Sequence, residues 1–286
     1  MRPNAQRPAL PAEVTALVGE TPRRLLGYGA ATAFAGRGMV AKVGPPEIVA
    51  REARILGGQL GCLPVEVPEL IAAGPGWLVM REVSDHAGAW DEPGFAALLG
   101  DLALLHDAFE SSPALAGGWL RDPAGVDLAA TIVEGGDQKG IELPDALTRV
   151  RADPGPVARV IARSGPLTLV HGDPTPANVL RPGGRRVWID WEWASAASAA
   201  VDLACWFGEG PWHFARPLDR DAALTAYLAA RRRPVDRDAF ELALDASLVL
   251  FLFANNLPSL AREAGSEALQ AMIAERLGAL GRIGLS

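Results

Sequence analysis

Two short blocks in the middle of the chain constrain its fold more than any other feature. Residues 171–178 are His-Gly-Asp-Pro-Thr-Pro-Ala-Asn, and residues 187–192 are Val-Trp-Ile-Asp-Trp-Glu. A Gly-Gly pair at residues 183–184 lies between them and favours a tight turn. The pattern therefore predicts a strand–loop–strand hairpin, which would bring two aspartates and one asparagine to one edge.

These three polar residues are of the types that phosphoryl transfer needs. An aspartate can hold an acceptor hydroxyl and accept its proton, and Asp173 is the candidate for this role. A hard cation prefers oxygen ligands, which predicts Asn178 and Asp190 as the residues that hold Mg²⁺. Polar turns that only cap hydrophobic strands could contain the same residues, but they would not require this spacing.

The pattern H-G-D-x-x-x-x-N followed by I-D-W resembles the aminoglycoside phosphotransferase family of kinase-like enzymes. Protein kinases carry the related H-R-D and D-F-G patterns, and this chain has no D-F-G and no A-P-E. The resemblance implies a bilobal, protein-kinase-like α+β fold. It implies an antiparallel-sheet N-lobe over residues 1–83, which binds the nucleotide, and a mainly helical C-lobe over residues 84–286, which binds the acceptor. It also implies ATP or GTP as the phosphoryl donor, together with Mg²⁺.

The first lobe contains a lysine and a glutamate that the resemblance pairs. Lys42 lies near the end of a strand-like run and is one of only two lysines in the chain, against twenty-five arginines. A lysine at this place can reach nucleotide phosphates as a point charge. By resemblance, Glu52 in a helix predicted over residues 47–60 holds Lys42 in place, and Glu47 is the rival. The alternatives are a solvated lysine and an ordinary helix-surface glutamate.

Further nucleotide contacts are predicted from position along the chain. Gly27 and Gly29 would let the backbone fold closely over phosphates, and Thr32 stands where a third glycine of G-x-G-x-x-G would be. A hairpin turn without a ligand would look similar. Glu82 and Val83 follow the last predicted strand and would meet the adenine edge through backbone groups. The strands are predicted at residues 24–26, 33–36, 38–43, 67–74 and 76–80.

The second lobe is predicted to be mainly helical. Its clearest helices are predicted at residues 93–109, 219–231, 236–254 and 259–283. His106 is expected to be a structural histidine that packs under the catalytic loop, residues 171–178, and His171 is expected to brace that loop. By resemblance, Asp202 in a D-L-A sequence ties the loop down, although Ser198-Ala199-Ala200 replaces the family's usual Gly-Asp-Pro before it.

The acceptor is predicted from charge and from a cluster of aromatic and acidic residues. Residues 1–90 hold nine Lys/Arg and eight Asp/Glu, whereas the remainder holds eighteen against twenty-six. The acidic second half disfavours nucleic acid and favours a cationic small molecule, although a generally acidic surface would give the same counts. Cation–π and carboxylate contacts could come from four residues, Glu192, Trp206, Glu209 and Trp212. The alternative is that the tryptophans pack between helices.

Three functions therefore stay open at this stage. Phosphorylation of an aminoglycoside or related antibiotic is the leading one. A metabolic kinase that acts on choline, homoserine or a sugar-like acceptor comes next, and a nucleotide-binding regulator is the third. The chain could be a monomer or a homodimer.

Composition also limits the setting in which the protein works. No apolar run follows the first residues, and the most apolar stretch, residues 247–254, is too short for a membrane span. We therefore expect a cytoplasmic protein without a membrane partner. Cys62 and Cys205 are too few for a disulfide framework or a cysteine metal site, and both are predicted to be buried free thiols.

Overall fold

The computed structural model of this 286-residue chain describes residues 10–25, 31–83, 90, 92–120, 143–163, 165–208, 219–253 and 267–285. The chain divides into two compact units. The first consists of Met1–Cys62, Glu66–His86 and Leu180–Glu192. The second consists of Leu63–Val65, Ala87–Val179 and Trp193–Ser286. The first unit thus includes a segment from the second half of the chain.

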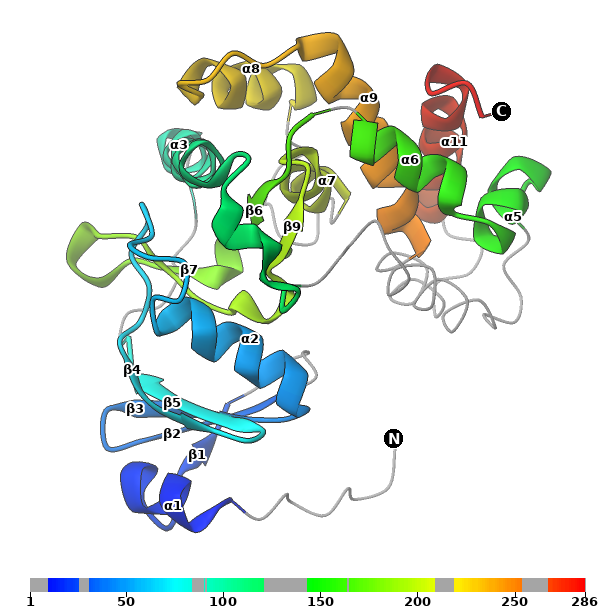
Figure 1. The fold of residues 1–286 in the computed structure, drawn as a ribbon. Coiled ribbons are helices and arrows are strands. Elements are labelled where there is room, and N and C mark those ends of the chain that lie inside the picture. The colour runs from blue at the N-terminus through cyan, green and yellow to red at the C-terminus, as the bar shows by residue number, and fades with distance from the viewer. Residues whose placement is uncertain are drawn as a thin grey trace. The chain divides into compact units, whose positions relative to one another are not determined.

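A five-stranded antiparallel sheet in the order β1-β2-β3-β5-β4 forms the centre of the first unit. Its strands are β1 (Arg23–Arg24), β2 (Thr32–Gly36), β3 (Met39–Val43), β4 (Leu70–Gly74) and β5 (Trp77–Arg81). Helices α1 (Ala12–Val18) and α2 (Pro46–Leu56) cover its opposite faces (Figure 1).

Side-chain alternation along the strands supplies an apolar surface to each of these helices. Ala41 and Val79 pack with Val14 and Val18 of α1. On the other face, buried side chains of β5 pack with α2, as Leu78 does against Val49. Because neighbouring residues of a strand point to opposite faces, Lys42 points to the face that α2 covers.

The predicted elements of this unit are present, with shifted ends. β1 is Arg23–Arg24, where residues 24–26 were predicted. β4 begins at Leu70, where residue 67 was predicted, because Pro68 has no N–H to donate to a neighbouring strand. The helix predicted over residues 47–60 ends at Leu56, and Gly58 then takes a positive φ of 75°.

Two short sheets flank the catalytic loop in sequence. β7 (Val179–Leu180) pairs with β8 (Val187–Trp188), and Gly183 and Gly184 between them have φ angles of 58° and 83°. The predicted turn is thus present. β6 (Thr168–Val170), which leads into the loop, pairs antiparallel with β9 (Ser195–Ala197) within the second unit.

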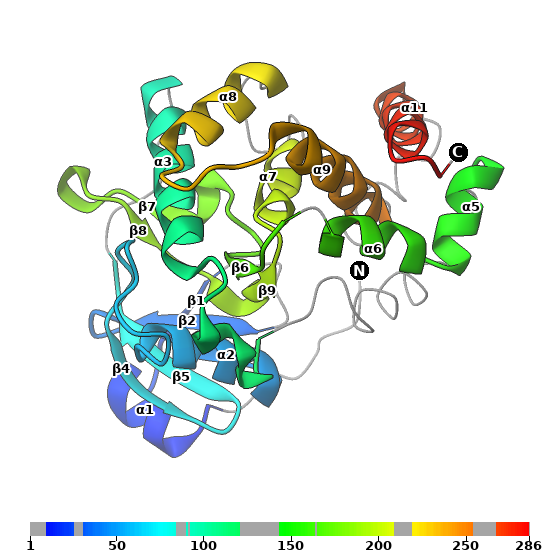
Figure 2. The same ribbon diagram turned by 45° about the horizontal axis from the view of Figure 1, so that its top comes forward.

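Helices form most of the second unit (Figures 1 and 2). They are α3 (Glu92–Phe109), α5 (Asp145–Ala152), α6 (Gly155–Arg163), α7 (Ala200–Gly208), α8 (Arg220–Ala230), α9 (Arg237–Phe251) and α11 (Glu267–Arg282). In both views α3 lies beside α8, while α9 packs on α7, α6 and α11. Asp219 and Asp236 cap the N-termini of α8 and α9 by accepting backbone N–H groups.

The helix predictions for this unit hold over the described residues. The helices predicted at residues 93–109, 219–231 and 236–254 correspond to α3, α8 and α9. The one predicted over residues 259–283 is present as α11, and its first residues lie outside the described part of the chain. None of the described helices is long and apolar enough to cross a membrane.

The prediction of two buried thiols is right for Cys205 and wrong for Cys62. Cys62 lies exposed after the glycine-containing turns that follow α2, in a segment that is neither helix nor strand. Cys205 lies on α7, inside the helical unit.

Candidate active site

Lys42 is held by two carboxylates within the first unit. Its Nζ donates to Glu52 Oε2 at 2.7 Å and Oε1 at 2.9 Å, and to Asp190 Oδ1 at 2.5 Å. In the sheet, Lys42 lies opposite Leu78, which packs against α2, so both strands direct side chains toward the helix that carries Glu52. The pairing that the resemblance implies is present, and the rival Glu47 is exposed.

The environment keeps the Lys42 amine charged. Burial acts to lower the pKa of Lys42, but the carboxylates of Glu52 and Asp190 outweigh this effect and raise the pKa above its ordinary value. Glu52 is 1% exposed, so its carboxylate depends on Lys42 for charge compensation. The amine is therefore available as a fixed positive charge.

Asp190 follows β8 in a conformation that is uncommon for a residue with a side chain. Its φ is 67°, in the left-handed region, and its side chain is 33% exposed. Such backbone strain persists where several contacts fix the segment. Here Lys42 binds the Asp190 carboxylate, and Arg51 of α2 donates to the Glu192 carbonyl at 2.5 Å.

In the second unit, Asp202 holds the backbone of the catalytic loop, residues 171–178. Its Oδ2 accepts the His171 N–H at 2.9 Å, and its Oδ1 accepts the Gly172 N–H at 2.8 Å. Asp202 is fully buried in the first turn of α7, so bulk water does not compete for these two bonds. The tie predicted from the D-L-A sequence is confirmed, despite the unusual residues before it.

Steric constraints require a glycine at the second position of the H-G-D sequence. Gly172 has a φ of 85°, and a Cβ on it would lie 2.3 Å from the Trp193 carbonyl oxygen. A side chain at this position would force the backbone of the loop to move. The residue before Asp173 is therefore fixed as glycine by the fold.

Three residues fix the side chain of Asp173 or the loop beside it. Asn178 Nδ2 donates to Asp173 Oδ2 at 2.7 Å and to the Asp173 carbonyl at 2.9 Å. Cys205 Sγ lies 3.6 Å from Asp173 Oδ1 as a weak donor. His171 Nδ1 accepts the Asp173 N–H at 3.3 Å, which is the bracing predicted for His171.

Asn178 and Asp190 each carry an oxygen atom of the type that a hard cation binds. Asn178 uses its amide nitrogen for Asp173, which leaves its carbonyl oxygen as the atom that could bind a metal. Asp190 uses Oδ1 for Lys42, and its Oδ2 is the second such atom. The two residues belong to different units, and each presents the atom type that Mg²⁺ prefers.

Comparison with known proteins identifies the family. The model of the phosphotransferase enzyme family, APH, matches residues 35–243, which is most of the chain. The chain belongs to this family. The recognition made from the H-G-D and I-D-W patterns is confirmed, and so is the prediction that the chain is a phosphotransferase. No curated protein matches the sequence.

Solved structures similar to this phosphotransferase share its fold. Aminoglycoside phosphotransferase APH(2'')-Ib, ADP-bound, is 15% identical with a TM-score of 0.59 and covers 96% of this chain and 99% of its own. Macrolide 2'-phosphotransferase type I is 20% identical with a TM-score of 0.57, covering 92% and 94%. A choline/ethanolamine kinase family protein from Mesorhizobium loti is 20% identical with a TM-score of 0.53, covering 94% and 96%. The predicted kinase-like α+β fold is thus confirmed.

The other predicted nucleotide contacts of this phosphotransferase are placed only in part. Gly27 and Gly29 lie outside the described residues. Thr32 begins β2. After β5, the Glu82 N–H donates to the Gly38 carbonyl at 2.9 Å, so this N–H is not available for a base. Of the backbone groups predicted to meet adenine, the Glu82 carbonyl and those of Val83 stay as candidates.

Two of the predicted acceptor contacts are buried, and two are not described. Trp206 is 1% exposed, and its indole N–H donates to the Pro174 carbonyl at 2.6 Å. Glu192 is 3% exposed. These placements favour the alternative of packed side chains, with Trp206 supporting the catalytic loop from α7. Glu209 and Trp212 lie outside the described residues.

Sequence reasoning missed two residues near the loop. Cys205 was treated only as a buried thiol, yet it contacts Asp173. Tyr227 was not singled out, yet it joins the contacts beneath the loop through His106. Neither residue belongs to a local sequence pattern. Helix packing brings both of them close to the loop, and this packing cannot be read from neighbouring residues.

Proposed function

We propose that this phosphotransferase moves the γ-phosphate of ATP or GTP to a hydroxyl of a small amino-containing molecule, with aminoglycosides and related antibiotics as the leading acceptors. The observation that carries the proposal is the catalytic loop, in which the Asn178 amide nitrogen donates to the Asp173 carboxylate, so that the Asn178 oxygen could bind a metal. A regulator that only binds nucleotide would not need this arrangement.

Each unit would supply part of the chemistry. Lys42, kept in place by Glu52, would bind the nucleotide phosphates, and Gly27, Gly29 and Thr32 would lie near them. Val83 and the Glu82 carbonyl would bind adenine.

Asp173 would orient the acceptor hydroxyl and take its proton as the oxygen attacks the γ-phosphorus. Asn178 and Asp190 would hold Mg²⁺, which neutralises charge on the phosphates when it is bound.

Charge and the similar structures support a cationic acceptor. Residues 91–286 hold twenty-six Asp/Glu against eighteen Lys/Arg, which would attract amines to this part of the chain. Two of the similar structures are named as aminoglycoside and macrolide phosphotransferases. A metabolic kinase with a choline-like acceptor is the second candidate, because the Mesorhizobium loti protein is named as a choline/ethanolamine kinase family protein.

The test is a transfer assay with the purified protein, Mg²⁺ and either ATP or GTP. The panel contains aminoglycosides, macrolides, choline, homoserine and sugar alcohols, and mass spectrometry follows the products. We expect one phosphoryl group to be added to one acceptor class. Nucleotide binding by calorimetry without transfer to any acceptor would favour the regulator, and absence of nucleotide binding would contradict the proposal altogether.

A further inference from the structure

A continuous series of buried contacts leads from Tyr227 on α8 to the catalytic loop. The Tyr227 hydroxyl lies 2.7 Å from His106 Nδ1, and His106 Nε2 lies 3.1 Å from Asp202 Oδ2. That same oxygen accepts the His171 N–H at 2.9 Å. Tyr227, His106 and Asp202 are each 0% exposed, so water does not replace any of these contacts.

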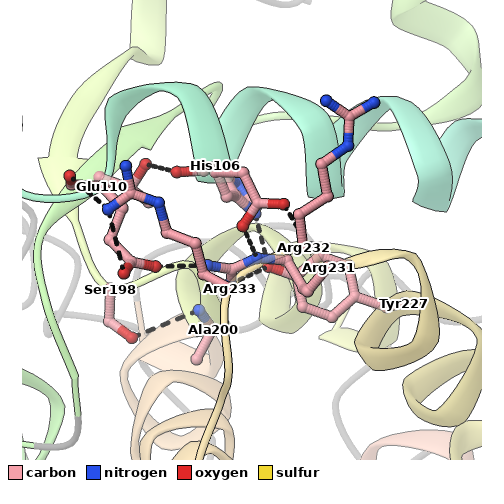
Figure 3. A network of polar contacts seen from close by, with 10 residues as sticks. His106, Glu110, Ser198, Ala200, Tyr227, Arg231, Arg232 and Arg233 are labelled. Atoms are coloured by element: carbon pink, nitrogen blue, oxygen red, sulfur yellow. Dashed lines mark hydrogen bonds and ion pairs between the residues drawn. The ribbon is translucent and has the colours of Figure 1, made fainter.

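The far end of the series is fixed by Arg231, just after α8. Its Nη1 donates to the Tyr227 hydroxyl at 3.1 Å, and its Nε donates to Asp107 Oδ1 at 2.6 Å. Its Nη2 also donates to Glu110 Oε2. Asp107 lies in the last turn of α3 and Glu110 follows the helix directly, so Arg231 joins the end of α8 to the helix that carries His106. Figure 3 shows Arg231, Tyr227 and His106 where these elements meet.

The order of donors along the series follows from chemistry. A guanidinium can only donate, so the Tyr227 oxygen accepts from Arg231, and donation to His106 Nδ1 satisfies the hydroxyl proton, which is buried. The imidazole then carries its proton on Nε2 and donates it to Asp202, which can only accept. Every donor between Arg231 and Asp202 therefore points toward the catalytic loop.

We propose that Tyr227 is a positioning residue for phosphoryl transfer, which holds the ring of His106 and, through Asp202, the backbone of the loop that carries Asp173. The proposal rests on the proposed function. Without the hydroxyl, Nδ1 is a buried acceptor that has lost its donor, and the ring has lost the contact that fixes its orientation from that side. The imidazole can then turn away from the Asp202 carboxylate, which loosens the hold of Asp202 on His171 and Gly172.

The replacement Tyr227→Phe removes the hydroxyl and keeps the aromatic ring. The ring stacks on Phe240 with centroids 5.6 Å apart and meets His106 edge-on at 5.7 Å, and phenylalanine keeps both contacts. Ser247→Ala is the matched control. It removes another buried hydroxyl with a 2.7 Å hydrogen bond, to the Ala243 carbonyl within α9.

The first readout is site-resolved hydrogen–deuterium exchange on the full-length protein. We expect Tyr227→Phe to speed exchange of the His171 and Gly172 amides about tenfold, the change for one lost hydrogen bond, while Ser247→Ala leaves them unchanged. Equal exchange at these amides in the two variants would overturn the proposal. This readout requires no acceptor, so it decides the question even if the proposed function fails.

The second readout uses the acceptor found in the transfer assay. We expect Tyr227→Phe to lower kcat about 10-fold to 100-fold, as loss of a supporting hydrogen bond does elsewhere, with the nucleotide KM unchanged. An unchanged kcat would overturn the role of Tyr227 while the proposed function stands. If Ser247→Ala lowered kcat by the same factor, the effect of Tyr227→Phe would be explained by lost stability alone, and this result would also overturn the proposal.

Discussion

In the first unit, charged side chains hold Lys42, whereas in the second unit the loop around Asp173 is held through its backbone. Lys42 bonds directly to Glu52 and Asp190, and two of these three side chains are also the proposed contacts of nucleotide and metal. Asp202 instead holds two N–H groups and lies fully buried. Ion pairs among groups that contact the nucleotide can rearrange when its phosphates bind. Hydrogen bonds from a buried carboxylate to the loop backbone stay unchanged.

This difference implies that nucleotide binding and turnover can be disturbed separately. Substitutions around Lys42 should change both nucleotide binding and the free energy of unfolding, because the same charged groups contribute to both. Substitutions beneath the catalytic loop should change turnover and leave nucleotide binding intact.

Loss of Lys42 should have the largest combined effect. Lys42→Met leaves the Glu52 carboxylate buried without compensation, and we expect a loss of about 3–5 kcal/mol of stability together with loss of nucleotide binding. The double variant Lys42→Met/Glu52→Leu should recover most of that stability, because an apolar pair can replace a buried ion pair. Binding should not recover. Urea unfolding and calorimetry measure the two effects, and recovery of binding in the double variant would contradict the role of Lys42.

Loss of one of the two Asp202 acceptor oxygens should lower turnover without changing nucleotide binding. Asp202→Asn keeps one oxygen acceptor and turns the other into a donor that faces an N–H, which displaces the loop. We expect kcat to fall about 10-fold to 100-fold with the nucleotide Kd unchanged. Steady-state kinetics and calorimetry measure both, and a parallel change in Kd would remove the distinction between the two units.

A carboxylate that serves stability alone should have the smallest effect. Asp245 pairs with Arg220 at 2.8 Å and with Arg282 at 2.5 Å. Burial acts to raise the pKa of Asp245, but the two guanidinium groups outweigh it and lower the pKa below its ordinary value. Because both arginines are partly exposed, we expect Asp245→Asn to cost about 1–3 kcal/mol near neutral pH, without change in kcat.

The pH dependence of that cost follows from the direction of the shift. A lowered folded pKa gives stability that is fully present above the ordinary value of about 3.9 and is lost as pH falls below it. The difference in stability between wild type and Asp245→Asn should therefore shrink toward about pH 3. Thermal unfolding across this range measures it. A difference that stayed constant would mean that the ion pairs are not its source.

The parts that sequence could predict are those encoded locally. Lys42, Glu52 and the turn at Gly183-Gly184 belong to short patterns in which residue type and spacing already define the contact. Tyr227 and Cys205 could not be predicted, because each meets its partner only through helix packing. Trp206 has an ambiguous signal, since an aromatic side chain can line a pocket or fill a core, and burial favours the core.

The central claim is that Asp173 serves transfer and not nucleotide binding. The most direct test is to measure kcat and nucleotide Kd for Asp173→Asn, which keeps the size of the side chain beside Asn178 and Cys205. We predict that kcat falls about 10²-fold to 10⁴-fold while the Kd measured by calorimetry does not change. Transfer that persists near the wild-type rate would contradict the account and require another group to take the proton.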